Sequence, residues 1–411
     1  MLVLYFAALV ALGGHAHWGR LGVPPASVEF LDLRNVIAAW HCHSKGIPVL
    51  PVNPCDPYHR PADFPQIWLL LSFLGIGQGG AVAFGIGIAV VFLVCAIFVV
   101  PAGASAWTGV AYAAALCSPA VMLGVERGNP DIVIFPLVLA AVLLTTRTRA
   151  GQILTGALLL FVTVLKLYPA FAAGYLVRRA TRASLTVLAV VAACSLVYVL
   201  ATYHYIREML SSIPQSSVLT YGVRRASEWF SALAIRVVHH FGSYRAWDVV
   251  LALIGIALGW LLSRRLRPHL RRSLLDRGEE RDLDLFWAGA CIYVGSYPVF
   301  LSHDYRLVFL LLTVPQIVRW TRARHPAGVA TVPVLLATLW LDEWTRMPVL
   351  RPFLDWWTRA TSVGPDALSL TVAVITQFLL FVAFVGWLLA SRPATLRPFN
   401  ERRSRWRSSS R

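Results

Sequence analysis

The chain has few charged residues. Asp, Glu, Lys and Arg make up 14% of its 411 residues, whereas 57% are hydrophobic. Soluble domains carry about 25% charged residues, so this deficit excludes an ordinary soluble protein. The apolar runs approach the length of about 20 residues that a helix needs to cross a bilayer. The sequence therefore predicts an all-α, polytopic helical membrane protein.

Acidic residues are the scarcer of the two charge types. There are 20 acids against 37 lysines and arginines, and the formal net charge is +17. In a soluble protein this excess would indicate a nucleic-acid partner. Here the arginines fall in short loops between apolar runs, which is the positive-inside pattern of cytoplasmic loops. We therefore expect membrane lipids, and no nucleic acid, as partners.

Cysteine is also sparse, with six residues in the whole chain. Four of them lie within apolar runs and are expected to be buried small hydrophobic residues. Cys42 and Cys55 lie in a polar interval assigned to the outer side, where a disulfide can form. The chain start lacks a basic segment and a clean cleavage site, so the run Met1 to Leu12 is expected to be a retained first span.

The alternation of apolar runs and arginine-rich turns predicts about twelve spans with both termini in the cytoplasm. We assign residues 1–390 to one transmembrane domain and residues 391–411 to a basic cytoplasmic tail that is expected to be disordered. The predicted outer segments are residues 17–65, 205–247 and 341–364.

One apolar stretch, Gly151 to Arg179, has basic residues at both ends, so both ends are expected in the cytoplasm. It must then turn back near Lys166 to Pro169, because a proline disfavours helical geometry at the residue before it. A lysine at that depth is a candidate functional residue. The alternative is a lysine that snorkels to the membrane interface.

The first outer segment concentrates polar residues that the rest of the chain lacks. It contains four acids, namely Glu29, Asp32, Asp56 and Asp63. It also contains a group of residue types that bind zinc in other proteins, namely His41, Cys42, His43, Cys55, Asp56 and His59. Their spacing is not that of a paired CxxC site, and the two cysteines can bond to each other, so we expect no metal.

Three further polar clusters fall near a membrane boundary on the same predicted face. They are ERGNPD at residues 126–131, KLYP at residues 166–169 and SHDYR at residues 302–306. This distribution suits an enzyme whose substrates arrive in the outer leaflet. A transporter would more naturally place charges at mid-depth, within broken helices.

These motifs carry a resemblance to a known family. The acid in the first outer loop, ERGNPDIVIFPLVLAAVLL at Glu126 to Leu144, the block from Ala150 to Arg179, and SHDYRLVFLLLTVP at Ser302 to Pro315 resemble glycosyltransferase family 87 of the GT-C membrane glycosyltransferases. That family includes actinobacterial polyprenyl-phosphomannose-dependent mannosyltransferases. The first loop departs from the family pattern, because HCHSKGIPVLPVNPCDPYHRP is more elaborate.

The resemblance implies a GT-C-like fold and a hexosyltransferase in the plasma membrane, with its active site on the outer face. A sugar, with mannose favoured, would pass with inversion from a polyprenyl-phosphate donor to a lipid or cell-envelope glycan acceptor. No cofactor is implied. The alternatives are a transferase of another sugar such as arabinose, a lipid-linked saccharide transporter or flippase, and a structural partner in an envelope complex.

The resemblance also implies roles for single residues. An acceptor hydroxyl needs a general base, and Asp32 matches the acid of the first loop, with Glu29 as the reserve. The apolar neighbours of Asp32 would strengthen it as a base. The alternative is that Asp32 caps a helix beginning near Leu33.

The departing phosphate gains negative charge, so preformed donors should meet it. His303, Arg306 and Lys166 are the expected phosphate-binding residues, although SHDYR could instead end a helix at the interface. Sugar or acceptor binding is assigned to Arg127, Asn129, Asp304 and Tyr305, with Asp304 orienting His303 or Arg306. A Gly-Asn-Pro turn followed by a helix-capping Asp131 is the alternative explanation of the first two.

Overall fold

The structure of the chain is a computed structural model. It describes residues 5–6, 14–145, 148–213, 220–237, 244–273, 280–299, 302–341, 347, 350–361 and 364–391. Most of the expected first span and all but the first residue of the predicted tail 391–411 lie outside the described residues. The same holds for parts of the outer segments 205–247 and 341–364.

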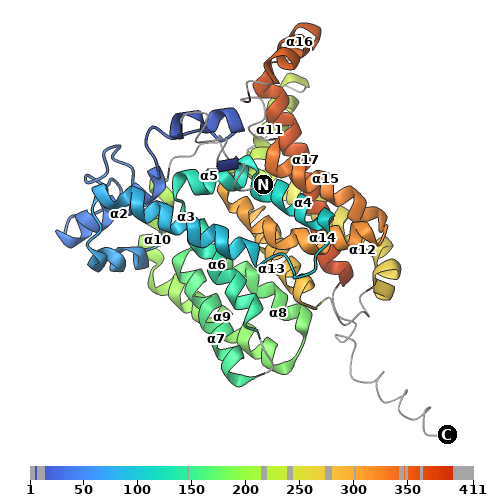
Figure 1. The fold of residues 1–411 in the computed structure, drawn as a ribbon, viewed down its shortest axis with the longest axis horizontal. Coiled ribbons are helices and arrows are strands. Elements are labelled where there is room, and N and C mark those ends of the chain that lie inside the picture. Colours follow the sequence, from blue (N-terminus) through green and yellow to red (C-terminus); the bar gives the residue numbers. More distant parts are fainter. Residues whose placement is uncertain are drawn as a thin grey trace.

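The regular secondary structure of the described residues is helical except for one short two-stranded ribbon (Figure 1). Its first third contains η1 (His15–Leu21), α2 (Leu31–Ser44), η2 (Gln66–Leu74), η3 (Gln78–Gly80), α3 (Ala81–Ile97), α4 (Ala106–Leu116), α5 (Pro119–Arg127) and α6 (Pro130–Leu143). The middle contains α7 (Arg149–Leu165), η4 (Tyr168–Ala173), α8 (Gly174–Arg179), α9 (Arg182–Ala201), α10 (Tyr203–Ser212), β1 (Thr220–Tyr221), α11 (Val223–Val237) and α12 (Tyr244–Ser273). The last third contains α13 (Glu280–Ser296), β2 (Ser302–His303), η6 (Asp304–Thr313), α14 (Val314–Arg322), α15 (Pro326–Trp340), α16 (Arg351–Thr361) and α17 (Pro365–Ser391).

Four helical segments are long and apolar enough to cross a membrane. They are Gln78–Ile97, Arg182–Ala201, Ala246–Pro268 and Pro365–Ser391. Large apolar side chains on all four of them are exposed, among them Val90, Val197, Leu253 and Leu379. Exposed apolar surface on this scale is unfavourable in water and favourable in lipid. The helices are therefore those of a membrane protein.

The expected count of about twelve spans is not confirmed. The described residues contain four spanning helices, or five if the bent pair α4 and α5 counts as one span. The bend of 51° in that pair has a local cause, because Ser118 caps a new helix that begins with Pro119. Other predicted spans are short, such as α6 with 14 residues, below the length that crosses a bilayer unaided.

The predicted turn within Gly151 to Arg179 is confirmed. Helix α7 ends at Leu165, and Lys166 has an extended backbone with φ −161° and ψ 128°. The chain then resumes as the 3-10 turn η4 at Tyr168 and continues into α8. The break leaves the Lys166 side chain free to leave the helix axis, which is how it reaches the cavity described below.

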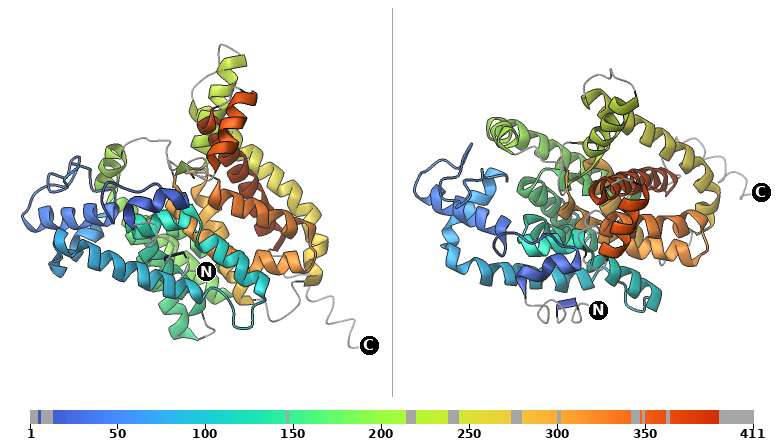
Figure 2. Two further views of the ribbon diagram at one scale, coloured as in Figure 1. Left: turned by 45° about the horizontal axis from the view of Figure 1, so that its top comes forward. Right: turned by 90° about the horizontal axis from the view of Figure 1, so that it is seen from above.

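The segment from η1 to η2 forms a lobe on one side of the molecule, and α10 lies beside it in both sets of views (Figures 1 and 2). Two buried tryptophans hold this lobe in place. Trp40 Nε1 donates to the Trp68 carbonyl at 2.7 Å, and Trp68 Nε1 donates to the Leu165 carbonyl at 2.8 Å. The second bond satisfies a carbonyl that the end of α7 would otherwise leave unpaired. Tyr205 of α10 joins the lobe through a bond of 3.2 Å from its hydroxyl to the Phe64 carbonyl.

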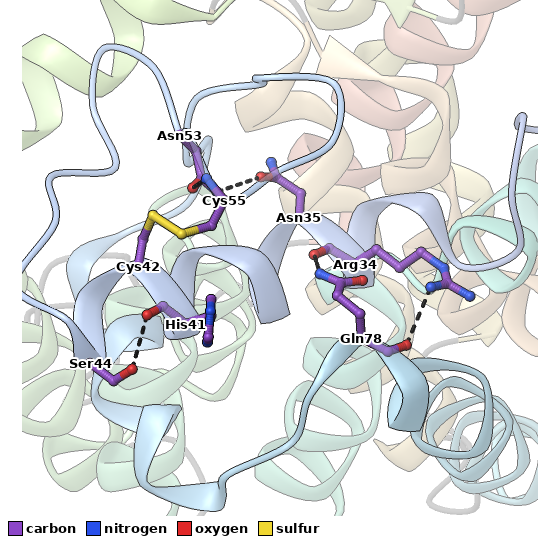
Figure 3. The surroundings of a disulfide bond; sticks show 8 residues. All are labelled: Arg34, Asn35, His41, Cys42, Ser44, Asn53, Cys55 and Gln78. Atoms are coloured by element: carbon purple, nitrogen blue, oxygen red, sulfur yellow. Dashed lines mark hydrogen bonds between the residues drawn. A yellow bond between two sulfur atoms is a disulfide. The ribbon is translucent and has the colours of Figure 1, made fainter.

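A disulfide joins the end of α2 to the loop that follows it. Cys42 and Cys55 are bonded, with their Cα atoms 5.7 Å apart (Figure 3). Beside them, Asn53 Nδ2 donates to Asn35 Oδ1 at 3.4 Å. These cysteines are therefore not free to bind zinc. Among the described residues, no group of three or more His, Cys, Asp or Glu side chains is arranged to hold a metal ion.

The ion pair between Asp56 and Arg60 also stabilises this loop. Arg60 Nη2 lies 2.8 Å from Asp56 Oδ1, and Arg60 Nη2 also donates to the Leu31 carbonyl at 3.0 Å. Burial opposes ionisation of Asp56, but hydrogen bonds and charge from Arg60 outweigh it and hold the pKa of that carboxyl below its usual value. The pair therefore ties the loop to the first turn of α2.

Candidate active site

A cavity of about 280 Å³ lies between the first loop, the break after α7, the end of α10 and the start of η6. Its polar walls combine residues from distant parts of the sequence, from Asp32 to Arg306. They are Asp32, Asp63, Asn129, Lys166, Ser296, His303, Tyr305 and Arg306, with Tyr168 beside them. Six of these residues were predicted as site residues. Apolar side chains of α10 and neighbouring segments complete the lining.

Asp32 enters the cavity from the first turn of α2. The helix begins at Leu31, and its N-cap residue is Phe30 in the left-handed conformation with φ 55°. Asp32 is therefore not the helix cap that the alternative explanation required. A carboxylate in the first turn is favoured by the positive end of the helix macrodipole. Its side chain is 26% exposed, so it can reach a molecule bound in the cavity.

Asn129 connects the acid to the basic wall. Its Nδ2 donates to Asp32 Oδ2 at 2.7 Å, while its Oδ1 accepts from the backbone N–H of Asp131 at 3.0 Å and from Lys166 Nζ at 3.4 Å. Asn129 itself is thus the N-cap of α6, and the expectation that Asp131 caps this helix is wrong. Because Oδ1 serves the cap, the amide can only present its N–H groups to Asp32.

Lys166 reaches the cavity as part of a buried ion pair. Its Nζ lies 2.7 Å from Asp131 Oδ1, and the two side chains are 13% and 0% exposed. The ammonium also lies 5.2 Å from the centre of the Tyr305 ring and 5.8 Å from that of Tyr168. A snorkelling lysine would extend to the interface, whereas Lys166 is held by a buried partner.

His303 and Arg306 come from SHDYR, which forms a strand and a 3-10 turn. Strand β2 pairs with β1 in antiparallel register, with His303 opposite Thr220. Arg306 Nη1 donates to Ser302 Oγ at 3.0 Å, and its guanidinium stacks 4.6 Å from the centre of the Tyr168 ring. The expectation that SHDYR simply ends a helix does not match this arrangement.

The Nε–H of Arg306 is buried and has no hydrogen-bond partner among the described residues. A buried guanidinium donor without an acceptor costs free energy. Arg306 also lines the cavity, so an anionic group bound there would accept charge-assisted hydrogen bonds from its guanidinium.

Three predicted residues lie elsewhere. Glu29 is exposed and borders a separate apolar cavity of about 350 Å³ beside α3 and α5. Arg127 Nε pairs with Glu126 Oε2 at 3.0 Å, and Asp304 is buried at the start of η6. Neither Arg127 nor Asp304 belongs to the described residues that line the main cavity.

Glu126, beside Arg127, has a structural task. Its Oε1 accepts from the Ala26 N–H at 2.7 Å, and its carbonyl accepts from the Phe30 N–H at 3.1 Å. These bonds hold the chain that leads into α2. The ERGNPD motif therefore positions Asp32 twice, through Glu126 at the entrance to the helix and through Asn129 at the carboxylate.

Asp63 is the acid in this cavity to which the sequence assigned no role. It stands between Pro61 and Pro65 in the same outer segment as Asp32. Nothing in the sequence distinguished it from the other three acids of that segment. Tyr168 and Ser296 also line the cavity, and nothing in the sequence distinguished them from interfacial or helix-interior residues.

Comparison with known families gives this arrangement a context. Residues 66–278, slightly more than half of the chain, match glycosyltransferase family 87. The chain belongs to glycosyltransferase family 87. No curated protein and no solved structure matches it.

The family match divides the cavity residues. Asn129 and Lys166 lie within the matched region, whereas Asp32, Asp63, His303 and Arg306 lie outside it and are brought to the same cavity by the fold. A glycosyltransferase needs a sugar donor and an acceptor. The cavity offers an acidic wall and a basic wall on which such molecules can lie.

Proposed function

We propose that this family 87 member is a GT-C-type hexosyltransferase that moves a sugar, with mannose favoured, from a polyprenyl-phosphate donor to a lipid or cell-envelope glycan acceptor. The observation that carries the proposal is the division of the cavity by charge. Asp32 and Asp63 stand on the wall of the first loop, and Lys166, His303 and Arg306 stand on the wall of η6 and the break after α7.

The basic wall suits the phosphate of the donor. The guanidinium of Arg306 lines the cavity, and a phosphate oxygen is a strong acceptor for it. The ammonium of Lys166 adds a second positive charge, and its ion pair with Asp131 holds it in position. Donors placed before the reaction stabilise the charge that develops on the leaving phosphate at little reorganisation cost.

The acidic wall suits the acceptor. Asp32 would take the proton of the acceptor hydroxyl as the hydroxyl oxygen attacks C1 of the donor sugar. The bond from C1 to the phosphate oxygen breaks, and its electron pair leaves with the polyprenyl phosphate. Attack opposite to the leaving group inverts the configuration at C1. Asn129 would hold the Asp32 carboxylate in position throughout.

The membrane placement of the proposal follows from charge and hydropathy. The arginine-rich turns are assigned to the cytoplasm and the cavity residues to the outer face of the plasma membrane. Both termini are assigned to the cytoplasm. Membership of a glycosyltransferase family supports a transferase over a transporter of lipid-linked saccharides. A donor with another sugar, such as arabinose, is the alternative within the same chemistry.

The test is sugar transfer by purified protein in detergent, with radiolabelled polyprenyl-phosphomannose, polyprenyl-phosphoarabinose and a panel of envelope lipids. Asp32→Asn should abolish transfer while donor binding persists, because the base is removed and the basic wall is intact. Glu208→Gln is the matched control, since Glu208 is an exposed acid on α10.

Transfer at the wild-type rate by Asp32→Asn would remove this residue from the mechanism. Transfer of arabinose and not mannose by the wild type would replace the sugar and leave the mechanism intact. If neither donor supports transfer and the protein moves the labelled lipid across liposome membranes, the transferase proposal is wrong.

A further inference from the structure

Asp63 shares the cavity with Asp32 but comes from a different part of the first loop. Its side chain is open to the cavity, in contrast to the neighbouring Phe64, which is 2% exposed. A carboxylate that is open to a cavity is placed to meet a ligand.

Helix α2 holds the two carboxylates relative to each other. Asn35 is buried and lies three residues after Asp32, so the two side chains share one face of the helix. Asn35 Nδ2 donates to the Pro61 carbonyl at 3.0 Å and lies 3.4 Å from Asp63 Oδ1. Asn53 in turn donates to Asn35 at 3.4 Å. Helix α2 therefore carries Asp32 and, through Asn35, also holds Asp63 in position.

Asp63 interacts electrostatically with charged residues of both cavity walls. Loss of part of its water shell and the negative charge of Asp32 raise the pKa of the Asp63 carboxyl, and the positive charges of Lys166 and Arg60 oppose part of that rise. Because Asp63 is exposed to the cavity, its carboxylate keeps part of its hydration. Asp63 therefore lies within electrostatic reach of both the proposed base and the proposed phosphate site.

We propose that Asp63 binds the acceptor by accepting a hydrogen bond from a hydroxyl next to the one that Asp32 deprotonates. This inference rests on the proposed function and names its acceptor class. Ionised carboxylates accept hydrogen bonds and cannot donate them, so the bound groups must be donors. The acceptor is then an uncharged polyol with two neighbouring hydroxyls, such as a hexose ring.

The same pair of acids gives the site a way to reject competitors. A carboxylate or phosphate on the acceptor ring, next to the reacting hydroxyl, would face two negative charges in a partly desolvated site. Anionic sugars should therefore be poor acceptors. The basic wall would still accept the phosphate of the donor, so the rejection applies to one substrate alone.

The experiment uses the full-length protein in detergent, polyprenyl-phosphomannose as donor, and octyl α-mannoside with its set of monodeoxy analogues as acceptor probes. Asp63→Asn keeps the shape of the side chain but removes its charge, and it should raise the KM for octyl α-mannoside roughly tenfold, because a charge-assisted hydrogen bond becomes a neutral one. The KM for the donor should stay within about twofold of the wild type, because the basic wall is untouched. Glu208→Gln should change neither value.

The decisive measurement compares the effect of Asp63→Asn on the KM for octyl α-mannoside with its effect on the KM for each monodeoxy probe. One monodeoxy probe should be a poor acceptor for the wild type, and its disadvantage relative to octyl α-mannoside should be much smaller for Asp63→Asn, since both changes act on the same bond. A purely structural role for Asp63 would lower transfer with every probe alike.

Two outcomes separate the inference from the function on which it rests. Wild-type transfer with an unchanged acceptor KM in Asp63→Asn, or equal losses with all probes, overturns the inference and leaves the transferase intact. Failure of the wild type to transfer from any polyprenyl-phosphate sugar overturns the proposed function itself.

Discussion

Asn129 uses one amide group to organise both sides of the cavity. Its oxygen caps α6 and accepts from Lys166, and its nitrogen donates to Asp32. The cap and the contact with Asp32 use different atoms. The stability of the helix and the orientation of the proposed base can therefore be separated by substitution.

Asn129→Asp is the substitution that separates them. Aspartate is as good an N-cap as asparagine, so the cap should be kept, and any fall in the melting temperature should come from repulsion between the two carboxylates. The new carboxylate would face Asp32 Oδ2 in place of a donor that lay 2.7 Å away, and repulsion should turn Asp32 from its position. We expect sugar transfer to fall by about 100-fold, the effect of a misplaced catalytic group. Transfer and melting measured on the same preparation check this, and unchanged transfer would contradict it.

Lys166 and Asp131 form a buried ion pair. We propose that Lys166 binds the donor phosphate and that Asp131 holds Lys166 in place. Removing one partner of a buried pair costs about 3–5 kcal/mol, because the remaining charge is left uncompensated. Lys166→Met should lower the free energy of unfolding by about this amount. It should also raise the KM for the donor, because the phosphate loses a positive charge.

The double variant Lys166→Met/Asp131→Asn tells the two roles apart. It should recover most of the stability, since no unpaired charge remains, but it should not recover donor binding. Lys45→Met is the control, because Lys45 is exposed at the end of α2 and is the other lysine of the chain. Recovery of donor binding in the double variant would mean that Lys166 only balances Asp131.

At the scale of elements, the start of α2 is held by close packing against α3. The buried residues of α3, namely Ala81, Gly85, Ala89, Phe92 and Ala96, recur at helical spacing and form one stripe. A Cβ atom at Gly85 would come within 2.5 Å of the Phe30 ring, whereas a Cβ at Gly87 would meet nothing within 4 Å. Phe30 is the N-cap residue of α2, two positions before Asp32.

Gly85→Ala should therefore displace Phe30 and the first turn of α2. We expect a loss of about 1–3 kcal/mol in the free energy of unfolding, as for other overpacked sites, and a fall in transfer of about tenfold or more. Gly87→Ala, two residues along the same helix, should change stability by no more than about 1 kcal/mol and leave transfer intact. Equal behaviour of the two variants would show that this packing does not position the acid.

At the scale of the whole molecule, α13 joins the arginine-rich turns to the cavity. Near its first residues, the buried Asp284 pairs with Arg178 and Arg179 of α8, and Arg281 donates to the Phe98 carbonyl after α3. Its last residue, Ser296, lines the cavity. Twelve residues of helix separate Asp284 from Ser296, a distance of about 18 Å.

Asp284→Asn should destabilise the protein without changing its chemistry. The two arginines would lose their buried counter-charge, at a cost of about 3–5 kcal/mol. Transfer per folded molecule should remain at the wild-type level, because the cluster is remote from the cavity. Glu280→Gln, an exposed acid on the same helix, should leave both properties unchanged. A fall in transfer per folded molecule would indicate that α13 couples the two ends of the protein.

Much of the site follows from local chemistry that the sequence shows directly. Lys166 was a candidate as a lysine within an apolar stretch, the resemblance to family 87 added Asp32 and Arg306, and the cavity collects all three. The break at Lys166 follows from the proline that comes after it. The roles of Glu126, Asn129 and Asp63 did not follow, because each depends on a partner far away in the chain or on which of several acids faces the cavity.

Composition alone determined that the chain is a helical membrane protein, since a long apolar run in lipid must satisfy its backbone hydrogen bonds within itself. Its motifs also indicated the glycosyltransferase family to which it belongs. The tertiary structure decided which helices are long enough to span a membrane, which atom caps α6, and which acids share a cavity. The physical reason is that these properties depend on contacts between distant segments, and periodicity and hydropathy describe one segment at a time.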